Sequence, residues 1–189
     1  TNQRFAADSI DGKQLMINLW DVASNQQSHY TDVQFYDLFS AADVMNLWRR
    51  VNTWWYAYSA YSSVSNFRAP LHQAPLLQQF LTTAQQAVEA GKPQATLRFG
   101  HESWLLPLAC LMELDDAGAR NVPFDSLSSV WQNYKIFPMG CNIQWVFYKN
   151  PGSNDVIMKV LLNEAEARLP VPTDIAPYYH WNDVRKYYQ

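Results

Sequence analysis

Apolar residues recur at helical spacing in two long segments of the chain. In the first, bulky side chains follow a 3.6-residue period, and Ser40 precedes Asp43 by three residues, as in a capping box. In the second, the apolar stripe ends just before Gly91, a residue typical of the end of a helix. The pattern predicts amphipathic helices over about 41–60 and about 74–90. The stripe of the first comprises Val44, Leu47, Trp48, Val51, Trp54, Trp55 and Tyr58.

Three shorter segments have the composition of β-strands. The first is Gln94–Phe99. The other two, Asn142–Tyr148 and Val156–Leu162, flank Asn150–Asn154, a run of turn-forming residues. The pattern predicts a short strand over residues 94–99 and a β-hairpin from the other two segments.

The remaining segments carry weaker signals. Residues 1–35 are mostly polar, which predicts irregular structure with one helix or short strand around Leu15–Leu19. A third helix is expected after Ser103, through Leu114, with Pro107 tolerated only near its first turn. A last short helix is expected after His180.

Composition limits the class of protein. The 189 residues are 48% hydrophobic and 16% charged, which is typical of a globular chain. We expect a single domain over residues 1–189, with a helical part over about 35–92, a sheet part over about 93–170 and a tail over 171–189. A net charge of −3 gives no sign of nucleic-acid binding, and no apolar run is long enough to cross a membrane.

Several common sites are absent from the sequence. It contains no GxxxxGK[ST], GxGxxG or GxSxG motif, and its four histidines are too scattered to suggest a metal site. Cys110 and Cys141 lack metal-ligand spacing. Two free thiols are the preferred interpretation, because Cys110 lies in a strongly apolar run, and one disulfide is the alternative. We therefore expect neither a metal nor a cofactor.

One segment combines residues that suit phosphate chemistry. His101 and Glu102 follow the predicted strand over residues 94–99 and precede the next predicted helix. A helix N-terminus at the carboxyl end of a strand offers free N–H groups to an anion. A positively charged imidazole could donate a hydrogen bond to a phosphate oxygen. A protonated carboxyl group could supply a proton to a leaving alkoxide.

Each of these residues also has a structural explanation. His101 could be satisfied by local hydrogen bonds, and Glu102 could be an exposed acid at a helix start. Arg98 either faces the site or points to solvent. Asn142 either borders a substrate pocket or makes hydrogen bonds within a turn, which is the preferred interpretation.

The run LRFGHESWLLPLACLMEL, residues 97–114, resembles the second signature of the histidine acid phosphatases. The resemblance is strongest to the multiple inositol polyphosphate phosphatases and phytases, through the His-acid element followed by Leu-Leu-Pro-Leu. Further matches are Phe137–Asn142 and Leu161–Glu164, and the resemblance extends over about 35–170. It implies an α/β fold with a partial phosphoglycerate-mutase-like sheet flanked by helices.

The resemblance also implies roles for individual residues. Members of that family hydrolyse phosphomonoesters through a phosphohistidine, and they need no cofactor. Here His101 would bind phosphate and Glu102 would donate the proton, while Arg98 and Asn142 would help to bind the substrate, an inositol phosphate such as phytate. The resemblance further implies a periplasmic or secreted protein, although the chain contains no signal peptide.

The sequence departs from the family pattern in two places. The inositol polyphosphate phosphatases usually carry His-Ala-Glu, whereas here Ser103 occupies the third position and the acid is Glu102. The nucleophile motif RHGxRxP is absent, so the chain would be the C-terminal part of such a protein, without its nucleophile strand and inactive alone. Its partner would be the missing N-terminal half or a second copy of the chain. The alternative is a non-catalytic phosphate- or sugar-binding module, or an inactive phosphatase fragment.

Overall fold

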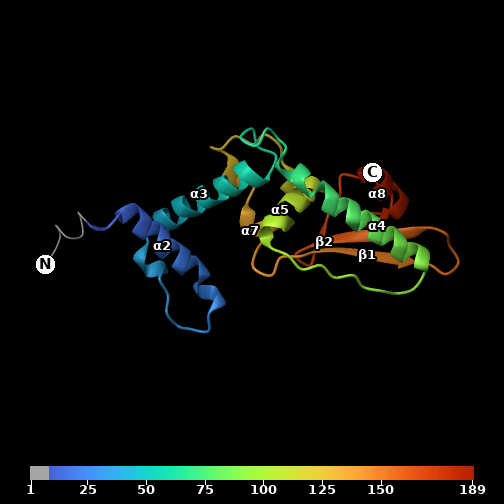
Figure 1. Cartoon of the computed structure of the whole chain (residues 1–189), viewed down its shortest axis with the longest axis horizontal. Helices are drawn as coiled ribbons and strands as arrows, with labels where there is room; N and C mark the ends of the chain where they lie inside the picture. The colour runs from blue at the N-terminus through green and yellow to red at the C-terminus, as the bar shows by residue number, and fades with distance from the viewer. Residues whose placement is uncertain (1–8) are drawn as a thin grey trace. The chain divides into compact units, whose positions relative to one another are not determined.

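The computed structural model describes residues 9–189 (for Gln27, the backbone only), and the chain forms two compact units, residues 1–51 and 52–189. The second unit contains the sheet, all four candidate site residues and the helices labelled α4 to α8 (Figure 1). The expectation of a single domain over 1–189 stays a prediction.

The helices follow one another along the chain with short 3₁₀ turns between them. The α-helices are α2 (Gly12–Asn25), α3 (Ala41–Ser59), α4 (Ala74–Ala90), α5 (Glu102–Leu111), α6 (Leu127–Val130), α7 (Asn133–Ile136) and α8 (Trp181–Tyr188). The 3₁₀ helices are η1 (Gln26–Ser28), η2 (Tyr36–Leu38), η3 (Ala69–Gln73) and η4 (Asp115–Gly118). No helix in the described part of the chain is long and apolar enough to cross a bilayer.

The unit formed by residues 1–51 begins, in its described part, with the capped helix α2. The Asp11 carboxylate accepts hydrogen bonds from the N–H groups of Lys13 and Gln14, as an N-cap does. Trp20 on this helix meets the rings of Tyr36 and Phe39 edge-on, with both centroid distances 6.1 Å. The helix alternative predicted around residues 15–19 is therefore confirmed, and residues 1–8 of that segment lie outside the described residues.

The predicted ends of the two long helices are confirmed. The Ser40 N–H donates to Asp43 Oδ2 at 3.1 Å and the Asp43 N–H donates to Ser40 Oγ at 3.2 Å, which closes the capping box at the start of α3. Hydrogen bonds from Ser40 lower the pKa of the Asp43 carboxyl group. At the end of α4, Gly91 adopts a left-handed conformation with φ of 62°, which a glycine adopts without strain.

The buried side of α3 differs from the predicted apolar stripe. Asn52 is 1% exposed, whereas Trp54, a member of that stripe, is 54% exposed. The Asn52 side chain donates to the Trp131 carbonyl oxygen at 2.9 Å and accepts from the Asn133 N–H at 2.8 Å. This pair of hydrogen bonds compensates the burial of a polar amide. Periodicity counts apolar residues alone, and for that reason it misplaced the buried face.

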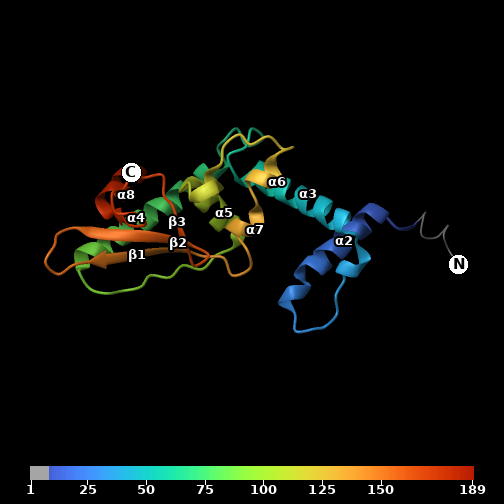
Figure 2. The ribbon, with the colours of Figure 1, turned by 180° about the vertical axis from the view of Figure 1, so that it is seen from behind.

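The sheet is antiparallel and has four strands, β1 (Ile143–Lys149), β2 (Val156–Leu162), β3 (Ala165–Ala167) and β4 (Tyr179–His180). Strand β2 is central, since it pairs with β1, β3 and β4, and β1 lies at an edge. The hairpin of β1 and β2 confirms the two strands predicted there, and helices of the same unit flank this sheet (Figure 2). The α/β fold with a partial sheet is therefore as predicted, while the short strands β3 and β4 were not predicted.

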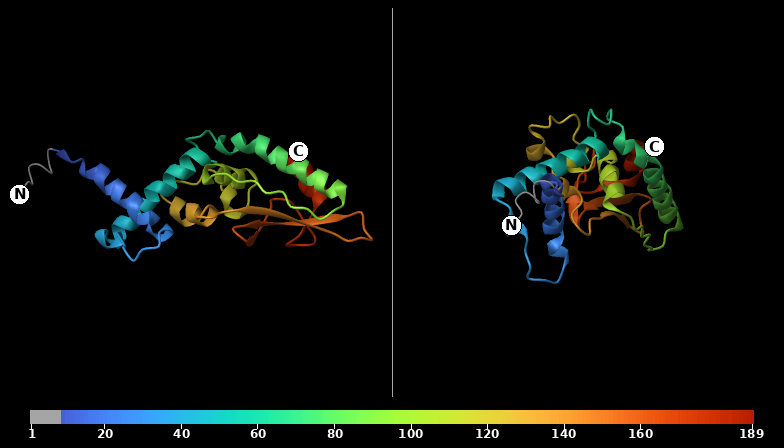
Figure 3. Two further views of the ribbon diagram at one scale, coloured as in Figure 1. Left: turned by 60° about the horizontal axis from the view of Figure 1, so that its bottom comes forward. Right: turned by 60° about the vertical axis from the view of Figure 1, so that its left-hand side comes forward.

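Aromatic side chains attach the sheet to the helices on one of its faces. Trp145 of β1 meets Phe80 of α4 at a centroid distance of 5.6 Å and Trp181 of α8 at 6.0 Å. Phe147, two residues further along β1, meets Trp181 at 5.1 Å. Residues two apart on a strand point to the same face, so α4 and α8 cover that face together (Figure 3).

Aromatic residues dock the C-terminal tail on the rest of the unit. The Trp181 indole N–H donates to Gln85 Oε1 at 2.8 Å, and the Tyr188 hydroxyl donates to the Met112 carbonyl oxygen at 2.6 Å. Burial raises the pKa of the Tyr188 hydroxyl. The helix expected after His180 is present as α8.

His180 lies between two carboxylates at the start of α8. Its Nδ1 is 2.8 Å from Asp155 Oδ2, and its Nε2 is 3.2 Å from Asp174 Oδ1. Both ring nitrogens can donate only in the protonated imidazolium. Asp155 first, and then Asp174, accordingly raise the pKa of His180.

Two expectations around the third helix are wrong. Gln94–Phe99 is not a strand: its backbone makes no hydrogen bond to any residue in the range 9–189. Leu97 and Phe99 are 75% and 93% exposed, so the extended segment has neither a partner strand nor a covering layer. Pro107 lies in the second turn of α5, not near the first. Because proline has no N–H, the carbonyl oxygen of Ser103, four residues earlier, receives no hydrogen bond within the helix. Ser103 is exposed, so water can donate to that oxygen instead.

Candidate functional site

A pocket of about 700 Å³ brings three of the predicted site residues together. Arg98, His101 and Asn142 all line it, although Asn142 is far from the other two in sequence. No acidic residue is among the lining residues, so the charged side chain there is a cation. The rest of the lining is Leu76, Gln79, Phe80, Phe99, Gly100, Trp104, Leu105, Leu108, Cys141 and Ile143.

The N-terminus of α5 supplies hydrogen-bond donors at the same place. His101 is the N-cap residue, with extended φ and ψ of −104° and 161°, and its side chain makes no capping hydrogen bond. The N–H groups of Glu102 and Ser103 donate to none of the described residues, whereas the N–H groups of Trp104 and Leu105 donate to the His101 carbonyl oxygen. Free N–H groups in a first helical turn attract an anion.

The His101 side chain is exposed and makes no hydrogen bond to any residue between positions 9 and 189. The alternative in which local hydrogen bonds satisfy this histidine therefore finds no support. Gly100 beside it has open space where a Cβ would be, and its φ is not positive. The packing of the chain therefore does not require a glycine at this position. The missing side chain leaves room for the close approach of a ligand.

Arg98 is held against helix α4 and does not extend freely into solvent. Its Nη2 donates to Thr83 Oγ1 at 2.8 Å, and its guanidinium carbon lies 4.6 Å from the centroid of the Phe80 ring. Because Phe80 also lines the pocket, this geometry places the cation at the pocket wall.

Glu102 is near the pocket without lining it. Its negative charge contributes to the raised pKa of the Cys141 thiol, for which burial is the larger cause. Cys141 lines the pocket and is partly exposed, whereas Cys110 is fully buried, which raises its pKa. Both cysteines are free, which confirms the preferred interpretation from the sequence.

Asn142 uses its polar atoms within the turn before β1. Its side-chain N–H donates to the Gly140 carbonyl oxygen at 3.3 Å, and its Oδ1 accepts from Gln144 at 2.9 Å. Its backbone N–H donates to Asn163 Oδ1 at 3.1 Å. The geometry fits the turn interpretation that the sequence favours, and the residue still forms part of the pocket wall.

Sequence reasoning missed the contribution of α4 to this pocket. Phe80 lies within the helix predicted over about 74–90, where an apolar residue suggests only a core contact, and nothing in the spacing of Thr83 and Arg98 along the chain signals their contact. Trp104 was likewise unremarkable in sequence, and 56% of its surface is exposed beside the pocket.

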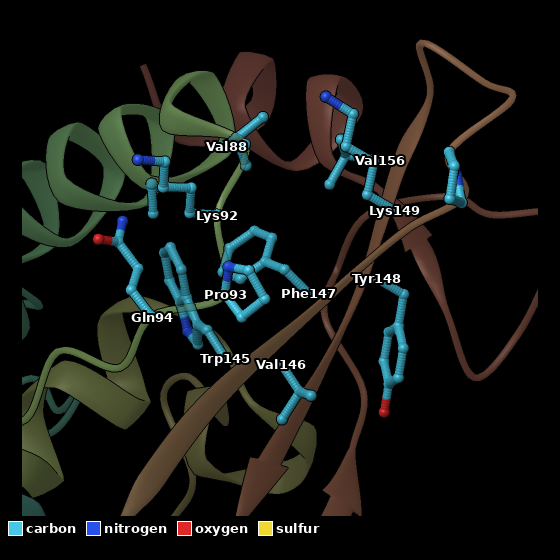
Figure 4. A pocket seen from close by; sticks show the side chains of 13 residues that line it. Val88, Lys92, Pro93, Gln94, Trp145, Val146, Phe147, Tyr148, Lys149 and Val156 are labelled. Atoms are coloured by element: carbon cyan, nitrogen blue, oxygen red, sulfur yellow. The ribbon is translucent and has the colours of Figure 1, made fainter.

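A second hollow of about 600 Å³ lies between the C-terminal end of α4 and β1 (Figure 4). Lys92 and Lys149 are its cations, and Trp145 and Phe147 form much of its apolar wall. In Figure 4 the two lysine side chains extend away from the Trp145 ring, so they do not converge on one point. The hollow therefore lacks the grouped polar side chains that the first pocket has.

Metal ligands do not cluster in the described part of the chain. No group of three or more His, Cys, Asp and Glu side chains there could hold a metal ion. The polar groups that line the first pocket include an arginine and an imidazole, and a carboxyl group and free backbone N–H groups lie beside it at the start of α5.

Comparison with known proteins addresses the fold. No family model matches the chain, and no curated protein matches it. The crystal structure of the multiple inositol polyphosphate phosphatase of Bifidobacterium longum, in complex with phosphate, matches with a TM-score of 0.72 at 22% sequence identity. The match covers 91% of this chain and 39% of that one. At this identity the likeness shows the fold alone: the chain has the fold of a part of that phosphatase, and it spans well under half of its length.

Proposed function

We propose that the pocket binds the phosphate group of a phosphomonoester and serves its hydrolysis. The observation that carries the proposal is that Arg98 and His101 line one pocket with no acidic residue among the lining. His101 is also the N-cap residue of α5, where the N–H groups of Glu102 and Ser103 donate to none of the described residues. An arginine fork and helix N-terminal donors both match phosphate oxygens. The same groups stabilise the charge that develops on those oxygens during transfer.

Glu102 is the proposed proton donor to the leaving alkoxide. It precedes Ser103 in the first turn of α5 and is close enough to the pocket for its charge to act on Cys141. Donation requires the protonated acid, and a bound phosphate dianion favours that form through like-charge repulsion.

Inositol phosphates are the proposed substrates. Support comes from the resemblance of residues 97–114 to that family and from the fold shared with an inositol polyphosphate phosphatase. The nucleophilic histidine would come from a segment carrying RHGxRxP, a motif absent from these 189 residues. The proposed partner of the pocket is therefore either the missing N-terminal half, which would carry this motif, or a second copy of the chain, which would supply a different nucleophile. A periplasmic or secreted location belongs to the same proposal.

A second candidate is phosphate binding without hydrolysis. It is favoured by the pocket lining, in which His101 is the one histidine. A phosphoenzyme mechanism needs one histidine to attack phosphorus while other groups hold the oxygens. If His101 holds a phosphate oxygen, the pocket wall contains no second histidine that could attack phosphorus.

Binding is tested first, through the thiol of Cys141. Cys110 is fully buried, so alkylation of the folded chain reports on Cys141, which lines the pocket. We expect phosphate to slow this alkylation in a saturable manner, relative to chloride at equal ionic strength. His101→Ala should weaken the protection. If phosphate leaves the rate unchanged, the proposed site is wrong.

Activity is tested separately, by phosphate release from phytate and p-nitrophenyl phosphate. We expect the 189-residue chain to be inactive, and a version joined to an N-terminal segment carrying RHGxRxP to be active. Activity of the joined version should disappear on His101→Ala. Protection of Cys141 without activity in either version would support the binding candidate. Activity of the 189-residue chain alone would refute the assigned roles.

A further inference from the structure

Arg98 is attached to α4 at two points. Its Nη2 donates to Thr83 Oγ1 at 2.8 Å, and its guanidinium lies over the Phe80 ring with the carbon 4.6 Å from the centroid. Phe80 and Thr83 are three residues apart on the helix and therefore share one side of it. The attachment links a regular helix to a segment, residues 94–99, whose own backbone is unpaired.

The Thr83 hydroxyl has a defined polarity. Its single hydrogen is donated to the Gln79 carbonyl oxygen at 2.8 Å, one turn earlier in α4. A hydroxyl carries one hydrogen and two lone pairs, so this bond leaves only acceptor capacity for Arg98. Helix α4 thus orients the Thr83 hydroxyl, and that hydroxyl in turn holds Nη2 of the Arg98 guanidinium.

An arginine held at one corner keeps other donors for a ligand. The guanidinium has five N–H groups in a rigid plane, and the contact to Thr83 uses one nitrogen. The ring of Phe80 limits rotation of that plane. Less side-chain freedom is lost on binding when the fork is already oriented, and this favours binding.

We propose that Thr83 and Phe80 are positioning residues that orient Arg98 at the pocket for the phosphate group of the substrate. The proposal rests on the proposed function of the pocket. It assigns to helix α4 a role in anion recognition, through a threonine that does not line the pocket.

The chain offers a matched control in the neighbouring threonine. Thr82 makes the same hydrogen bond to the carbonyl one turn earlier, from its Oγ1 to the Gln78 oxygen at 2.9 Å, and it has no hydrogen bond to an arginine. Thr82→Val and Thr83→Val therefore delete the same local bond and add the same β-branched side chain. They differ in the contact to Arg98.

The experiment compares the phosphate concentration that half-protects Cys141 in these variants. We expect Thr83→Val to raise it about three- to tenfold, the range that corresponds to the net contribution of one typical intramolecular hydrogen bond. Thr82→Val should leave this phosphate concentration unchanged. Thr83→Ser should also leave it close to that of the unchanged chain, because the hydroxyl is kept. In an Arg98→Ala background, Thr83→Val should have no further effect, as a double-mutant cycle requires for two residues that act together.

The outcomes separate the two proposals. If phosphate does not protect Cys141 in the unchanged chain, the proposed function of the pocket fails. If phosphate protects it, and Thr83→Val behaves like Thr82→Val, the pocket stands and the positioning role is refuted. Phe80→Leu provides the second test of that role, since it keeps an apolar side chain and removes the ring under the guanidinium. A phosphate affinity unchanged by Phe80→Leu would remove Phe80 from the proposal.

Discussion

Removal of the buried Asn52 amide should be among the most damaging single changes to the unit formed by residues 52–189. Asn52 is 1% exposed, and its side chain makes two hydrogen bonds to the backbone, with the Trp131 carbonyl and the Asn133 N–H. Asn52→Ala deletes both. Each buried partner that is left without its hydrogen bond costs about 1–3 kcal/mol, so the two together predict a loss of about 2–6 kcal/mol.

The assay is chemical denaturation, followed by the fluorescence of the tryptophans. Asn182→Ala is the matched control, because Asn182 lies exposed on helix α8 of the same unit. We expect that control to change the free energy of unfolding by less than about 0.5 kcal/mol. Asn52→Asp is the second variant: it keeps the acceptor for the Asn133 N–H and loses the donor to Trp131. A loss below about 1 kcal/mol for Asn52→Ala would show that water replaces the amide, and the reasoning would be wrong.

Two further predictions concern other parts of the same unit. Because the folded-state pKa of His180 lies above its unfolded value, its contribution to stability is fully present below the unfolded pKa and is lost as pH rises through the folded pKa. Unfolding midpoints measured from about pH 5 to about pH 9 should therefore fall with rising pH, and His180→Gln should abolish this fall. An identical pH profile for the unchanged chain and the variant would contradict the stabilisation of His180 by its two carboxylates. Gly118→Ala should destabilise the fold by about 1–3 kcal/mol, because a Cβ there would lie 2.8 Å from the Cα of Glu113. Gly100→Ala, with open space around it, is the control in the same denaturation assay, and equal losses for the two would refute the steric argument.

The helices and the hairpin were predictable because their signals are local. The capping box at Ser40, the left-handed Gly91 and the turn residues between β1 and β2 each act within a few positions. The strand expected over residues 94–99 was wrong for the opposite reason. Its sequence suits a strand, but a strand also needs a neighbour, and no described residue pairs with it.

The candidate site was predictable only in part. The segment around His101 is a contiguous motif, so it could be found from sequence alone. The contact of Arg98 with Thr83 joins two segments whose meeting depends on how α4 lies beside the pocket. No pattern of hydropathy encodes that meeting, because both residues are polar and neither is needed for the core.

The unpaired backbone of residues 94–99 has a consequence for the strength of any binding at the pocket. This segment carries Arg98 and leads into His101, and its one side-chain hydrogen bond to the described residues is that of Arg98 to Thr83. A chain without backbone hydrogen bonds samples many arrangements of similar free energy, and a ligand that requires one of them binds more weakly in proportion to its population. Pairing this segment with a neighbouring strand would raise that population without contacting the ligand. Any contact outside the pocket that orders the backbone of residues 94–99 would therefore strengthen the binding of a ligand at the pocket.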